Sequence, residues 1–121
     1  MNRYSDLIME HFMEPQNRGK LENPSGVGLS GCPGEGPFMV FQIVCIDLIV
    51  TEAVFQSHHC GVTVACGSVL TTMVLNKSLS QCKLITGKDV SEALNGVPLD
   101  KMHVPEFAVS ALEQAIKEAL T

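Results

Sequence analysis

The chain has 121 residues and a formal net charge of −5, and it is 45% hydrophobic but only 17% charged. This length predicts a single domain, residues 1–121, with one ordinary core. The low charge content indicates that a partner covers part of the surface. Because the net charge is negative and no basic cluster occurs, we expect no nucleic-acid partner.

The sequence also argues against membrane insertion and secretion. It contains no apolar run of about 18 residues, so we expect no membrane span. Its first residues, Met-Asn-Arg-Tyr-Ser-Asp, lack the apolar core of a signal peptide. The five cysteines are odd in number and widely spaced, which is typical of a reducing compartment. We therefore expect a cytoplasmic protein.

The first half of the chain predicts one helix and two or three strands. Apolar residues at helical spacing begin after Ser5, a plausible N-cap, and the helix ends before Pro15. Residues 14–37 form a long connection with six glycines and four prolines, and such loops are usually functional or mobile. Residues 38–46 and 48–57 predict a hairpin that turns near Asp47, and residues 27–30 are a candidate third strand.

The second half predicts helices only. Helical patterns cover about 61–75, 79–85 and 88–94, and Gly96 stops the last of these. Pro105 suits the first turn of a final helix, residues 105–120. Strands early in the chain and helices late in the chain predict the α+β class, with an antiparallel sheet packed against helices.

Cys60 is the most informative residue, because it lies where the strand pattern ends and the helix pattern begins. At a helix N-terminus, unpaired N–H groups and the helix dipole favour the thiolate, which binds metals and attacks electrophiles. The competing interpretation is that Cys60 is a small buried hydrophobe. His58 and His59 precede it as candidate auxiliary ligands or as a solvated strand end.

The four other cysteines fall into two groups according to their position in the sequence. Three lie within predicted strands or helices and are expected to pack in the interior: Cys45, Cys66 and Cys82. Cys32 lies among glycines and prolines, in a loop poorly suited to bury it, so both a functional and an incidental role stay open. His11 lies on the apolar face of the first helix and is expected to be a capped or core histidine.

Several short blocks then occur in one order along the whole chain: YSDLI at 4–8, EHF at 10–12, PQNRG at 15–19, MVFQI at 39–43, AVF at 53–55, CGVTVACGS at 60–68, KSL at 77–79 and KMH at 101–103. Together they resemble the NifU-like (IscU-type) iron–sulfur cluster assembly scaffolds. The resemblance implies a sheet of three antiparallel strands packed under helices. It also implies a loop-rich face where three cysteines and an Asp or His assemble a nascent cluster, and a cysteine desulfurase that supplies the sulfur.

The same resemblance reveals departures from the family pattern. The family's Cys-Gly-Asp triplet falls on Glu35-Gly36-Pro37, so a carboxylate replaces the first thiol, although Cys32 lies three residues earlier. The second family cysteine matches Cys60. The third follows a histidine directly, but here His103 is followed by Val104.

The candidate ligands are therefore Cys60 and His103, with Cys32 or Glu35 contributed by the glycine-rich loop. Two thiolates, one imidazole and one carboxylate could hold a labile iron–sulfur cluster, which we expect to be of the 2Fe–2S type. The same donors suit tetrahedral zinc.

Three functions follow from this set. The first is a scaffold or carrier that binds iron and a nascent cluster and passes it to apo-protein acceptors; this function is not enzymatic. The second is a degenerate pseudo-scaffold that binds a desulfurase-type partner without maturing clusters. The third is a thiol enzyme with Cys60 as nucleophile and His103 as base, although the sequence supplies no oxyanion site.

Overall fold

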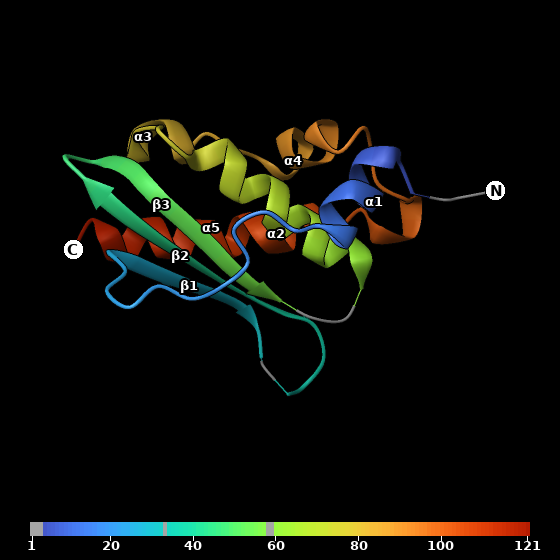
Figure 1. Ribbon diagram of the computed structural model, residues 1–121, viewed down its shortest axis with the longest axis horizontal. Coiled ribbons are helices and arrows are strands. Elements are labelled where there is room, and N and C mark those ends of the chain that lie inside the picture. The colour runs from blue at the N-terminus through green and yellow to red at the C-terminus, as the bar shows by residue number, and fades with distance from the viewer. Residues whose placement is uncertain (1–3, 33, 58–59) are drawn as a thin grey trace.

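The computed structural model describes residues 4–32, 34–57 and 60–121. In chain order the elements are α1 (Asp6–Met13), β1 (Gly26–Gly31), β2 (Phe38–Ile46), β3 (Ile49–Ser57), α2 (Gly61–Val74), α3 (Leu79–Cys82), α4 (Gly87–Ala93), the 3-10 turn η1 (Leu99–Lys101) and α5 (Val104–Ala119). The predicted α+β class with a three-stranded antiparallel sheet is confirmed (Figure 1). His58 and His59, the candidate auxiliary ligands, lie outside the described residues, as does Pro33.

The sheet has the order β1-β2-β3, and both pairs of neighbours are antiparallel. Residues Gly28, Phe41 and Phe55 lie opposite one another and so share one face. The hairpin turns at Asp47 and Leu48, whose φ angles of 53° and 66° match the turn that suits the twist of two-residue hairpins. The predicted turn near Asp47 and the candidate third strand are therefore confirmed.

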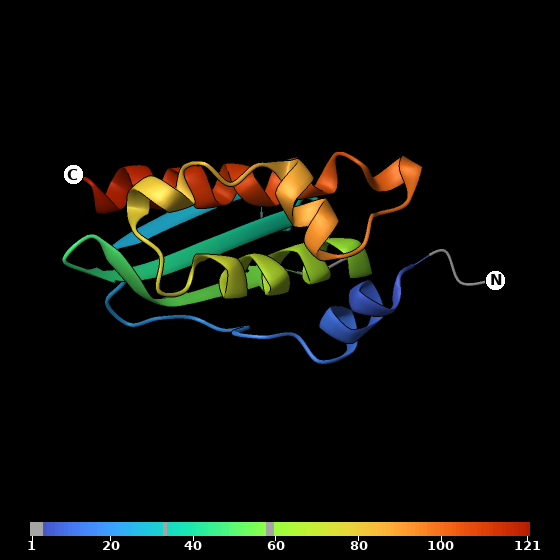
Figure 2. The same cartoon turned by 90° about the horizontal axis from the view of Figure 1, so that it is seen from above.

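Two long helices cover the face that carries Phe41 and Phe55. A Cβ at Gly28 would overlap the carbonyl oxygen of Ala111, so α5 lies directly on the backbone of β1. A Cβ at Gly67 would overlap the ring of Phe55, so the backbone of α2 packs directly on a side chain of β3. Figure 2 shows α2 and α5 running along the sheet, with α1 on the side of α2 away from α5. The core lies between these helices and the sheet.

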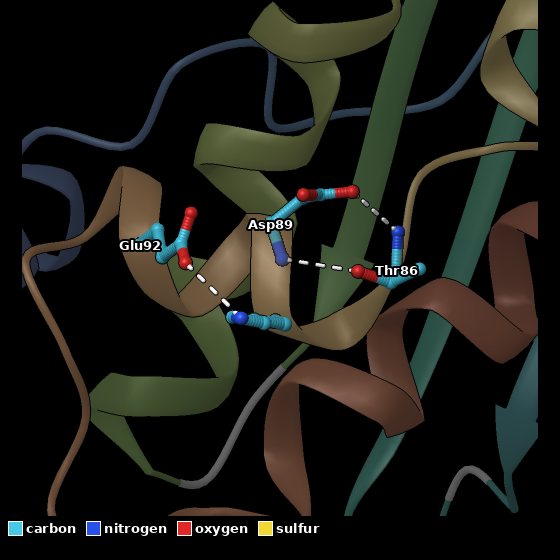
Figure 3. Close-up of polar contacts among 4 residues, drawn as sticks. Thr86, Asp89 and Glu92 are labelled. Carbon is cyan, nitrogen blue, oxygen red and sulfur yellow. Dashed lines mark hydrogen bonds and ion pairs between the residues drawn. The ribbon is translucent and has the colours of Figure 1, made fainter.

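Side-chain caps explain where several helices begin. Ser5 accepts a hydrogen bond from the N–H of Ile8 and caps α1, as predicted. Thr86 and Asp89 bond each other's backbone N–H and form a capping box at α4 (Figure 3). The figure also shows Glu92 paired with Lys88, at 3.9 Å between Oε1 and Nζ.

Two expectations need correction. The helix predicted over 79–85 ends at Cys82, because the chain turns after Lys83 to reach the capping box of α4 at Thr86. Cys45 is half-buried rather than in the core, because the register shifts between Val44 and Cys45 near the end of β2. Cys66 and Cys82 are buried as predicted. None of the helices in the described residues is both long and apolar enough to span a membrane.

Candidate metal centre

Cys60 caps the N-terminus of α2 with its side chain. Its backbone is extended, with φ −95° and ψ 151°, and its sulfur accepts a hydrogen bond from the N–H of Thr63 at 3.4 Å. The hydroxyl oxygen of Thr63 lies 3.0 Å from the same sulfur. The predicted position of Cys60 at the start of a helix is confirmed. Its half-buried side chain differs from the fully buried Cys66, in keeping with a thiol at a surface pocket.

Two contacts hold the chain where β3 leads into α2. The guanidinium of Arg18 donates to the carbonyl oxygen of Ser57 at 2.8 Å, at the last residue of β3. The ring of Phe12 lies against Gly61, the first residue of α2, where an added Cβ would come within 3.2 Å of the ring. Helix α1 and the connection from α1 to β1 therefore both contribute to fixing Cys60.

Cys60 and His103 line the same small cavity. Its volume is about 170 Å³, and the lining residues are Pro37, Cys60, Thr63, Lys101, His103, Val104 and Phe107. His103 occupies the N-cap position of α5 and is exposed. The cavity is smaller than the roughly 300–1,000 Å³ that is typical of pockets for organic ligands. It therefore suits an ion or a small inorganic group.

The chain topology explains this meeting of distant residues. Strands β1 and β3 run in the same direction, so the last residues of both strands lie at one end of the sheet (Figure 1). The register places Gly31 opposite Phe38 and Met39 opposite Ser57 at this end. Helix α5 also starts here, where the hydroxyl of Ser30 donates to the carbonyl oxygen of Phe107 at 2.7 Å.

The loop candidates, Cys32 and Glu35, do not line this cavity. Both side chains are exposed, and the N–H of Glu35 donates to the carbonyl oxygen of Cys32 at 3.0 Å, which closes a tight turn. Of the described residues of this loop, only Pro37 lines the cavity. Within the described part of the chain, no group of three or more His, Cys, Asp or Glu side chains is arranged to hold a metal ion. The structure thus brings together two of the four candidate ligands.

Thr63 and Lys101 also line the cavity, although the sequence did not predict them as site residues. For each residue, its position in the sequence contains a signal that could have identified it. Thr63 stands three residues after a capping residue, the position whose N–H the cap accepts. Lys101 stands two residues before His103 in the KMH block. Its ammonium adds a positive charge beside the thiol and the imidazole, and this charge favours anionic cargo.

The remaining thiols and His11 have structural surroundings. Burial raises the pKa of the Cys66 thiol to about 12, and burial also raises the pKa of Cys82, so both stay protonated at neutral pH. His11 is half-buried rather than in the core, and its Nδ1 lies 2.7 Å from the hydroxyl of Ser68 on α2. The N–H of Gln16 donates to the same hydroxyl at 2.7 Å. All five cysteines lie in described segments, and none forms a disulfide there.

Known proteins are similar to this chain in sequence and in fold. A scaffold protein of Archaeoglobus fulgidus, "Iron-sulfur cluster assembly scaffold protein IscU 1", is 38% identical over 113 residues, which are 93% of this chain and 74% of the relative. The Aquifex aeolicus "Iron-sulfur cluster assembly scaffold protein IscU" is 34% identical over 119 residues, 97% of this chain and 76% of the relative.

The solved structure of a nitrogen-fixing NifU-like protein (N-terminal) from Brucella abortus has the same fold. Its TM-score is 0.77 at 14% identity, over 98% of this chain and 94% of that one. The family model described as "NifU-like N terminal domain" matches residues 3–120. The resemblance seen in the sequence blocks is thereby confirmed: the chain belongs to the NifU-like N-terminal domain family.

Proposed function

We propose that this protein is an iron–sulfur cluster assembly scaffold or carrier, which binds iron and a nascent cluster at the cavity of Cys60 and His103. The observation that carries the proposal is the meeting of a helix-capping thiol and an imidazole in one ion-sized cavity. The relatives named as scaffolds, which match more than nine-tenths of the chain, support it.

The donor atoms in the cavity are of types that bind this cargo, but they are few. Thiolate and imidazole both bind iron in clusters, and both bind zinc. Cys60 and His103 would hold the metal first, and Cys32 or Glu35 would complete the set from the loop that ends at Pro37. Because Cys60 is the only thiol among the described residues that line the cavity, we expect a labile 2Fe–2S cluster, with zinc as an alternative occupant.

The proposal includes partners and a compartment. A cysteine desulfurase would supply the sulfur, and apo-proteins would receive the cluster. The low charge content of the chain leaves surface for such contacts. Five thiols without a disulfide suit the reducing cytoplasm, where we place the protein.

Anaerobic reconstitution with ferrous iron and sulfide tests the proposal. We expect sulfur-to-iron charge-transfer absorbance from the wild type and none from Cys60→Ser. Serine is a good N-cap, so this substitution removes the sulfur while α2 stays capped. Cys45→Ser is the matched control, because Cys45 lies near the hairpin turn at the far end of the sheet. It should retain the absorbance.

The pseudo-scaffold is the second candidate, and the replacement of two family cysteines by Glu35 and Val104 favours it. A wild type that develops no charge-transfer absorbance, yet binds a cysteine desulfurase, would overturn the scaffold proposal in favour of this one. Absorbance that persists in Cys60→Ser would contradict the site.

A further inference from the structure

Thr63 contacts the sulfur of Cys60 with two groups. Its backbone N–H donates to Sγ at 3.4 Å, and its hydroxyl oxygen lies 3.0 Å from Sγ. The side chain is 3% exposed and lines the same cavity as Cys60 and His103. The threonine therefore lies behind the sulfur, inside the first turn of α2.

Other threonines of the same helix behave differently. The hydroxyl of Thr71 donates to the carbonyl oxygen of Ser68 at 2.7 Å, and that of Thr72 donates to the carbonyl oxygen of Val69 at 2.6 Å. Each bonds the backbone three residues earlier, as helical threonines commonly do. For Thr63 the residue three positions earlier is Cys60, and there the hydroxyl reaches the side-chain sulfur.

When Cys60 binds a metal ion, the direction of the hydrogen bond between the Thr63 hydroxyl and the sulfur is determined. A cysteine that binds a metal ion is a thiolate and has no proton to donate. The hydroxyl of Thr63 must then be the donor, beside the N–H that already donates. Hydrogen bonds to a ligand sulfur orient it and shift the reduction potential of a cluster.

We propose that Thr63 is a positioning residue of the metal centre, whose hydroxyl and N–H aim the Cys60 sulfur into the cavity and donate to it when it binds metal. This inference rests on the proposed function, since it concerns the same cavity. It adds a residue that acts through the Cys60 sulfur.

Zinc affinity, measured by competition with a chromophoric chelator, provides the first test. Thr63→Val keeps the size and the β-branch but removes the hydroxyl, and we expect it to weaken zinc binding by about tenfold or more. Thr63→Ser restores the hydroxyl and should bind zinc nearly as the wild type does. Thr72→Val is the matched control, with the same substitution on the same helix outside the cavity, and should bind as the wild type does.

The reduction potential of the reconstituted cluster provides a second test, which a purely structural role would not move. Losing a donor to the sulfur should lower the potential in Thr63→Val, and Thr63→Ser should restore it. Circular dichroism checks folding, and Thr63→Ala replaces the valine variant if that one fails to fold.

The outcomes separate this inference from the proposed function. If Thr63→Val equals the wild type in zinc affinity and in potential, the inference is wrong and the scaffold function stands. If the wild type binds zinc through Cys60 but forms no cluster, the scaffold function fails, and the zinc series alone decides the role of Thr63. If the wild type binds neither, both are overturned.

Discussion

At the residue scale, the open question of the site is which side chain of the glycine-rich loop joins Cys60 and His103. Glu35 stands two residues before Pro37, so its Cα lies within about 7 Å of a residue that lines the cavity. Cys32 is farther along the chain but supplies the softer donor. Gly34 and Gly36 have φ angles of 86° and 102°, and a Cβ on either would meet nothing within 4 Å, so the loop has room to change course.

We expect Cys32 to be the working ligand, because thiolates are the preferred donors for iron–sulfur clusters and bind zinc well. Cys32→Ser should then lower zinc or iron content about as much as Cys60→Ser does, and Glu35→Ala should lower it less. Metal analysis of freshly purified variants measures the order. The reverse order would assign the position to Glu35, and unchanged metal content in both variants would remove the loop from the site.

At the element scale, β1 and α5 are in direct backbone contact. No side chain separates the two, because Gly26 and Gly28 face the carbonyl oxygens of Ala115 and Ala111. A methyl group on Gly28 must push the helix away from the strand, and the neighbouring atoms belong to the backbone and cannot rotate aside.

We therefore expect Gly28→Ala to lower the free energy of unfolding by about 2–3 kcal/mol, the upper part of the range for overpacked cores. Urea denaturation followed by circular dichroism measures the change. Gly19→Ala is the control, since a Cβ there would meet nothing within 4 Å and the variant should unfold as the wild type does. Equal stability of the two variants would show that α5 can slide on β1 at little cost.

The sequence predicted most elements because their signals are local. Alternation of apolar residues marks β2 and β3, and Ser5 and Pro105 mark the starts of α1 and α5. The predicted end of α3 was wrong because apolar periodicity does not reveal the capping box that begins the next helix, between Thr86 and a residue three positions on. The glycines of β1 gave no hint of their role, because it depends on a helix some 85 residues later in the chain.

The same reasoning separates the predicted from the unpredicted part of the site. Cys60 could be predicted because the pattern changes from strand to helix at its own position. Lys101 joins it only because β1 and β3 end on the same side and α5 returns there. Such meetings depend on the topology of the whole chain.

At the scale of the whole molecule, the attachment of α1 to the body makes stability depend on pH. Burial lowers the pKa of His11, and the nearby carboxylate of Glu10 offsets part of this effect. The unfolded chain therefore takes up a proton at this histidine at higher pH than the folded chain does. Stability from neutral His11 is complete above the ordinary pKa of about 6.5 and is lost as the pH falls through the lower, folded value.

We expect the urea midpoint of the wild type to fall between pH 7.5 and pH 5.5, and to fall less in His11→Asn. Asparagine can still hydrogen bond to the hydroxyl of Ser68 but does not titrate. The difference between the two slopes, at most one proton per molecule, isolates His11 from the other histidines. Parallel slopes would show that His11 does not contribute to the pH dependence and would contradict its lowered pKa in the folded protein.

The packing of α5 on β1 and of α2 on β3 has a consequence for the two ligands. His103 stands at the start of α5, which packs on the backbone of β1, and Cys60 stands at the start of α2, which packs on the ring of Phe55 in β3. Neighbouring strands in a sheet are held about 4.8 Å apart by their hydrogen bonds. The sheet therefore fixes how far apart the two helices begin, and the separation of the thiol from the imidazole depends on strand spacing rather than on the loops alone.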